Sequence, residues 1–116
     1  MSRGLVLSVI LACVGCGGPS VGPNGHDVGG SCNSVRECSS YCTFDTDFGN
    51  GVTGMCTGRC STDRDCPNGT SCVTNDGGVC AVTCGATSEC AGFGRAYLCK
   101  AENRTSGGSI NVCRLP

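Results

Sequence analysis

The spacing of the cysteines constrains this chain more than any other feature. Twelve of its fourteen cysteines follow residue 31 and fall into three sets of four: Cys32, Cys38, Cys42 and Cys56; Cys60, Cys66, Cys72 and Cys80; Cys84, Cys90, Cys99 and Cys113. Each set opens with two cysteines that have five residues between them, and three residues separate one set from the next. An acidic residue directly precedes the second cysteine each time: Glu37, Asp65 or Glu89. This self-similarity predicts an array of three small modules, which we call units 1 (residues 32–56), 2 (57–80) and 3 (81–116).

Composition indicates that covalent links, rather than a large core, hold these units together. The 116 residues include no Trp, two Tyr, three Phe and twenty Gly, against fourteen Cys. Glycine makes folding entropically costly, and so few large apolar side chains offset little of that cost. A cysteine content this high in a short chain is typical of a disulfide scaffold. We therefore expect a small disulfide-rich fold of loops and short β-hairpins in three tandem modules, with little helix after the N-terminal segment.

Turn signals place the expected hairpins. Asp76-Gly77 separates residues 73–74 from residues 79–82, which predicts a short hairpin, and Asn50-Gly51 predicts another tight turn. A last strand is expected at residues 110–115, after a Ser/Gly-rich stretch. No sustained helical period of apolar residues follows Val14.

Disulfide pairing is restricted if each unit closes on itself, because four cysteines allow three pairings. We favour first-to-third and second-to-fourth, which in unit 2 means Cys60 with Cys72 and Cys66 with Cys80. One alternative is a bridge between units. Another is a Cys72–Cys80 bond, because the predicted hairpin brings these two residues together.

The N-terminus predicts export. Residues 1–15 have a basic residue at Arg3 and an apolar run at residues 5–14 that is too short to span a bilayer, as in a signal peptide. The stretch Val14-Gly15-Cys16 resembles the lipobox of bacterial lipoproteins, with Cys13 where that family usually has Leu. The resemblance implies that Cys16 is lipidated, becomes the mature N-terminus and attaches the protein to a membrane. Cys13 is the second candidate, but cleavage there would leave Cys16 as an odd thiol in an oxidising compartment.

Residues 16–31 are rich in Gly and Pro and lack hydrophobic periodicity, which predicts a flexible tether between membrane and cysteine-rich body. The single histidine, His26, lies within it. A flexible segment cannot hold a catalytic or metal-binding geometry, so we assign His26 no such role.

Other chemistries fit the pattern less well. The mature chain has no C-x2-C pair of the kind that zinc sites and thiol oxidoreductases use. Asp45-Thr46-Asp47 resembles the start of a calcium loop, but the glycine that follows is one place late and Cys56 stands where the bidentate Glu belongs. Asp63 and Asp65 are the other weak calcium candidates. We expect no enzyme, metal or cofactor, and the near-zero net charge gives no reason to expect nucleic acid as a partner.

The sequence from Cys60 to Cys72, CSTDRDCPNGTSC, resembles extracellular repeats of the pattern C-x-x-D-x-D-C-x-x-G-x-x-C, including the amino-terminal cysteine-rich domain of Dickkopf-type proteins. Asp63, Asp65 and Gly69 carry this resemblance, and units 1 and 3 lack the Pro67-Asn68-Gly69 turn. The resemblance implies extracellular binding without catalysis.

Together these features predict an exported, lipid-anchored protein with a structural or protein-binding role at the cell surface. An alternative is a secreted inhibitor or toxin-like effector in which the loop at residues 67–69 inserts into its target. A third is an envelope protein without a dedicated ligand.

Overall fold

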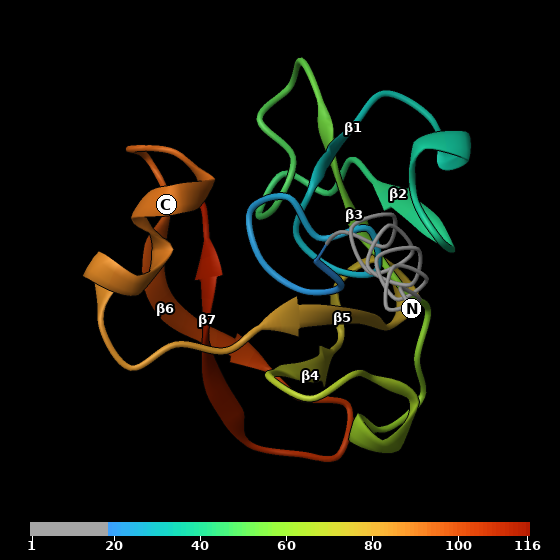
Figure 1. Ribbon diagram of the computed structural model, residues 1–116. Coiled ribbons are helices and arrows are strands. Elements are labelled where there is room, and N and C mark those ends of the chain that lie inside the picture. The colour runs from blue at the N-terminus through green and yellow to red at the C-terminus, as the bar shows by residue number, and fades with distance from the viewer. Residues whose placement is uncertain (1–18) are drawn as a thin grey trace, which may run out of the picture.

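The computed structural model describes residues 19–116, so the predicted signal peptide, Cys13 and Cys16 lie outside the described residues. It confirms a small disulfide-rich fold of strands and loops, in which helix is limited to 3-10 turns (Figure 1). The strands are β1 (Ser31–Cys32), β2 (Tyr41–Thr43), β3 (Gly54–Thr57), β4 (Thr70–Val73), β5 (Val79–Val82), β6 (Leu98–Asn103) and β7 (Ser109–Arg114). The 3-10 turns are η1 (Val35–Glu37), η2 (Asp63–Asp65), η3 (Asn75–Gly77) and η4 (Thr87–Phe93). Among residues 19–116, no helix has the length and apolar character needed to cross a membrane.

Each unit contains one antiparallel hairpin. The strand order is β1-β3-β2 in unit 1, β4-β5 in unit 2 and β6-β7 in unit 3. The hairpin predicted around Asp76-Gly77 is present, with Val73 opposite Val79, although η3 makes its loop longer than a two-residue turn. The predicted last strand is β7, which pairs with β6 across the turn at Gly107 and Gly108.

A third strand segment completes every unit, and it comes from the residues before the first cysteine. The residue preceding the first cysteine lies opposite the residue preceding the last one: Ser31 with Met55, Arg59 with Val79, and Thr83 with Val112. The hydrogen bonds repeat as well, since the Cys56 and Cys80 amides donate to the carbonyls of Gly30 and Gly58 at 2.7 and 3.1 Å. The three-residue connectors are therefore strands of the unit that follows them.

This rule explains why residues 19–31 differ from the flexible tether that their composition predicts. Val28 is fully buried, and the Gly29 amide donates to the Cys56 carbonyl at 2.9 Å. Gly29 has a φ of +118°, and a Cβ there would lie 2.0 Å from the Gly22 carbonyl oxygen. In this part of the chain glycine permits close packing, because unit 1 needs the segment as its third strand.

The three units share one core and do not form a linear array. The core joins Phe48 and Met55 of unit 1, Val73 and Val79 of unit 2, and Val112 of unit 3. Unit 3 also contacts unit 1 directly, since the Tyr97 hydroxyl donates to the Phe48 carbonyl. A second, smaller cluster contains the unit 1 cysteines Cys32, Cys42 and Cys56, with Cys38 packed against it.

Candidate functional site

All twelve cysteines of the described residues form disulfides, and every disulfide lies within one unit. The pairs are Cys32–Cys42, Cys38–Cys56, Cys60–Cys72, Cys66–Cys80, Cys84–Cys99 and Cys90–Cys113. This is first-to-third and second-to-fourth pairing in all three units. It confirms the favoured pattern, including both pairs predicted for unit 2, and leaves no bridge between units within residues 19–116.

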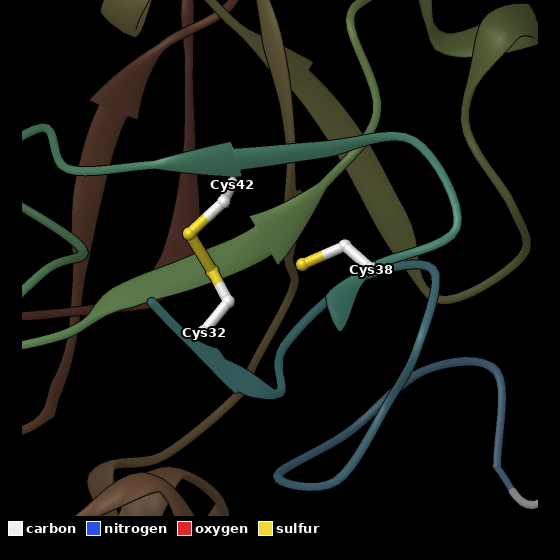
Figure 2. A group of neighbouring side chains, drawn as sticks. All are labelled: Cys32, Cys38 and Cys42. Carbon is white, nitrogen blue, oxygen red and sulfur yellow. A yellow bond between two sulfur atoms is a disulfide. The ribbon is translucent and has the colours of Figure 1, made fainter. Parts of the chain in front are cut away.

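The hairpin register explains how two disulfides fit side by side. The third and fourth cysteines of each unit lie directly opposite one another, as Cys72 and Cys80 do, so their side chains share one face. Each bonds to a cysteine of the unit's first turn rather than to its neighbour. The sulfurs consequently gather, as Figure 2 shows for Cys38 beside the Cys32–Cys42 bond, with three sulfur atoms within 4.8 Å of one another. In these gathered groups the sulfurs are disulfide sulfurs and not the thiolates that bind zinc.

The recurring acidic residue has a structural role. In each unit its carboxylate accepts a hydrogen bond from the amide directly after the first cysteine: Asn33 to Glu37 at 2.8 Å, Ser61 to Asp65 at 2.8 Å, and Gly85 to Glu89 at 2.9 Å. Amides of Ser61 and Thr62 hold the pKa of Asp65 below its usual range. The acid thus caps the first turn of each unit by accepting from one backbone amide, and in unit 2 it also completes a capping box with Thr62.

A second acceptor recurs three residues after the first cysteine. Asp63 Oδ1 accepts from the Cys72 amide at 2.8 Å, and Thr87 Oγ1 accepts from the Cys99 amide at 3.2 Å. The Cys72 amide, the Ser71 hydroxyl and the Arg104 guanidinium together lower the pKa of Asp63 to about 2. The equivalent residue of unit 1 is Val35, which has no acceptor. Asp63 and Asp65, the weak calcium candidates, are therefore engaged by donors of the fold itself.

The other calcium candidates lie where the three units meet. The Arg114 guanidinium of unit 3 lies 2.7 Å from the Asp47 carboxylate and 2.8 Å from the Glu102 carboxylate. The side-chain amide of Asn75 in unit 2 donates to Asp47 at 2.8 Å and to Asp45 at 3.3 Å. Burial, followed by the neighbouring Asp47, raises the pKa of Glu102 to about 7. A hydrogen bond with Glu102 lowers the pKa of Asp47. The guanidinium is the cation among these carboxylates, and the cluster joins the units.

His26 is exposed and lies beside a hollow of about 210 Å³ that Glu37 and Cys56 also line. A neighbouring hollow of about 260 Å³ lies between the N-terminal segment and unit 3, lined by Pro23, Met55 and Tyr97. The turn proposed as an inhibitory loop is also exposed at Asn68 and Gly69, and the Thr70 amide closes it onto the Pro67 carbonyl at 3.1 Å.

Three large apolar side chains of the described residues are exposed: Val35, Phe44 and Val52. Sequence reasoning singled out none of them. Alignment of the units contained a usable signal, because Val35 stands where the other units have Asp63 and Thr87. That signal has a meaning only once those two side chains are known to accept hydrogen bonds.

Comparison of the chain with protein-family models, with curated proteins and with solved structures finds no match.

Proposed function

We propose that this protein is exported, anchored by lipid at Cys16, and has a structural or protein-binding role at the cell surface. The observation that carries the proposal is the N-terminal sequence, in which a short apolar run precedes small residues and Cys16 and resembles a bacterial lipobox. Disulfide parity supports it. The twelve later cysteines are all paired, so a mature chain lipidated at Cys16 would carry no free thiol in an oxidising compartment.

The roles of the polar residues agree with a binding or structural function rather than with catalysis. The carboxylates of Asp63, Asp65 and Glu89 are engaged by amides of their own units. Asp47 and Glu102 share Arg114. The resemblance of the stretch from Cys60 to Cys72 to extracellular cysteine-rich repeats supports the same interpretation.

The decisive experiment is the intact mass of the mature native protein, combined with its partitioning between water and detergent. We expect a chain that begins at Cys16, carries acyl groups and enters the detergent phase. Cys16→Ala should abolish processing and partitioning, whereas the matched variant Cys13→Ala should leave both intact. If Cys16→Ala is processed and partitions like the parent protein, the anchor is elsewhere and the proposal is wrong.

One observation favours a secreted inhibitor or effector as the second candidate. The exposed turn at residues 67–69 is held from both ends, by the Cys66–Cys80 disulfide and by a 3.0 Å hydrogen bond from the Thr83 amide to the Gly69 carbonyl. A loop held in this way loses little entropy on binding. A mature mass without lipid and a protein confined to the aqueous phase would favour this candidate.

A further inference from the structure

In each unit the first strand of the hairpin is β2, β4 or β6. One edge of this strand pairs with the other hairpin strand, and the opposite edge, which we call the outer edge, does not. In unit 2 the Cys80 amide bonds to Gly58, away from β4, so Cys72 and Cys80 form a pair without mutual hydrogen bonds. The amide and carbonyl of Cys72 consequently face outward. The same holds for Cys42 of β2, because the Cys56 amide and carbonyl bond to Gly30 and Gly29.

The outer edge of β4 is occupied by another part of the chain. Three outward groups have partners: the Cys72 amide donates to Asp63, the Cys72 carbonyl accepts from the Thr105 amide at 3.2 Å, and the Thr74 amide donates to the Asn103 carbonyl at 2.9 Å. Between these bonds Arg104 lies antiparallel to Val73, and its guanidinium pairs with Asp63. Unit 3 thus adds a short strand to the edge of unit 2.

The equivalent edge of unit 1 has no such occupant among residues 19–116. Its three outward groups are the Cys42 amide, the Cys42 carbonyl and the Phe44 amide, and no group of residues 19–116 hydrogen-bonds to any of them. Among residues 19–116 the Cys42 amide therefore has no hydrogen-bond partner, although the residue as a whole is only 5% exposed. Figure 2 shows β2 with β3 along its other edge.

Unit 3 shows how this fold protects such an edge. On β6 the Thr87 hydroxyl accepts from the Cys99 amide, and the next residue is the exposed Lys100, a type of residue that discourages strand pairing. On β2 both features are missing. Turn η1 packs against β2 as η2 packs against β4, but it offers Val35, which is 52% exposed, and the strand is followed by Phe44, which is 51% exposed.

We propose that the outer edge of β2 binds an extended segment of a partner protein by antiparallel strand addition. The segment takes the place that residues 103–105 take on β4, with one carbonyl accepting from the Phe44 amide and one amide donating to the Cys42 carbonyl. At the position of Arg104 it carries an apolar residue, because Val35 replaces the Asp63 that Arg104 meets in unit 2. The inference rests on the protein-binding role proposed above and specifies the chemistry of that partner.

Hydrogen exchange on the full, oxidised mature protein tests the open edge first. The amide of Phe44, which is 51% exposed, should exchange much faster than that of its counterpart Thr74, which donates to the Asn103 carbonyl. Equal protection of the two edges would overturn the proposal.

Synthetic peptides test which kind of segment binds to the outer edge of β2. The probe is a blocked synthetic peptide of residues 101–107 carrying Arg104→Val, and the controls are the same peptide with Arg104 retained and a version N-methylated at Thr105. The apolar probe should protect the Phe44 amide and shift the resonances of Cys42 and Phe44. Its affinity should be about three- to tenfold higher than that of the Arg peptide, as expected for one mispaired side chain at a partly exposed site. N-methylation should abolish binding. Binding that ignores the methyl group, or an absence of binding at millimolar peptide, would overturn the proposal.

Substitution of Val35 should reverse the preference between the two peptides. Val35→Asp reproduces Asp63 and should transfer the preference to the Arg peptide. Val35→Thr reproduces Thr87 and should weaken the binding of both peptides. Retention of six disulfides shows that each variant folds. An unchanged preference in Val35→Asp, or a concentration-dependent dimer through β2 in place of peptide binding, would overturn the proposed partner. Neither result bears on lipidation at Cys16, so failure of this inference is distinguishable from failure of the proposed function.

Discussion

Single residues in this protein carry electrostatic roles that their sequence positions conceal. Glu102 lies on β6, where a charged residue ordinarily faces solvent, yet its side chain is only 10% exposed. It shares Arg114 with Asp47, and one guanidinium cannot fully compensate two partly buried carboxylates. The pair therefore retains a proton that an exposed glutamate would release, and this proton links folding to pH.

Stability should consequently fall as the pH rises from about 4.5 to about 7. The folded pKa of Glu102 is raised to about 7, so folding takes up a proton in this window, and the stabilisation is complete below the unfolded pKa of about 4.5. Glu102→Gln should flatten this part of the curve. The measurement is the thermal midpoint at a series of pH values, and an unchanged slope in Glu102→Gln would show that Glu102 titrates normally.

At the scale of elements, the repeating structure is a capped turn, a hairpin and a connector strand, joined by two crossed disulfides. The disulfides do not all serve the same part of the fold. Cys32 and Cys42 belong to the small cluster of unit 1, whereas Cys90 and Cys113 lie in the core that all three units share. The consequences of losing them should differ in extent.

Replacing Cys32 and Cys42 together by Ser should loosen unit 1 locally, while replacing Cys90 and Cys113 should destabilise the whole molecule. Each loss removes a loop closure worth about 3 kcal/mol in the chain-entropy model, and the second also places polar atoms in the shared core. Hydrogen exchange across all units distinguishes local from global opening. Equal and local effects of the two double substitutions would contradict a common core.

At the scale of the whole molecule, the three units close on one another. Unit 1 meets unit 2 where Tyr41 and Thr43 donate to Asp76, both at 2.9 Å, and where the Arg59 guanidinium stacks 4.1 Å from the Tyr41 ring. Unit 2 meets unit 3 through Arg104, and unit 3 returns to unit 1 through Tyr97. This closure gives a chain with few aromatic residues one core that all three units share, beside the small cysteine cluster of unit 1.

Tyr97→Phe tests the closure. It removes the hydroxyl that donates to the Phe48 carbonyl and leaves that buried acceptor without a partner, at a cost of about 1–3 kcal/mol. The control is Tyr41→Phe, whose hydroxyl bonds to Asp76 in a more exposed place and should matter less. Chemical denaturation of both variants gives the comparison. A smaller loss for Tyr97→Phe than for Tyr41→Phe would argue against direct packing of unit 3 on unit 1.

Much of the covalent scaffold was predictable because its determinants are local. Cysteine spacing is read directly from the chain, and confinement to units left few pairings, of which the crossed one is found. The hairpin around Asp76 and the strand at residues 109–114 follow from turn residues and β-branched neighbours. The capping role of Glu37, Asp65 and Glu89 was visible only as a repeated acid of unknown purpose.

The remaining features depend on contacts between residues far apart in the chain. Residues 19–31 have a linker's composition, and only pairing with β3 makes their glycines part of a unit. The raised pKa of Glu102 depends in part on Asp47, which is 55 positions away in the sequence. No sequence pattern connects these two residues. The exposure of Val35 becomes informative only once the adjacent outer edge of β2 is seen to have no partner among residues 19–116. Local sequence thus determined the disulfide-linked units. Tertiary structure alone decided which polar groups were buried together and which strand edge has no partner among residues 19–116, because burial depends on how the units pack.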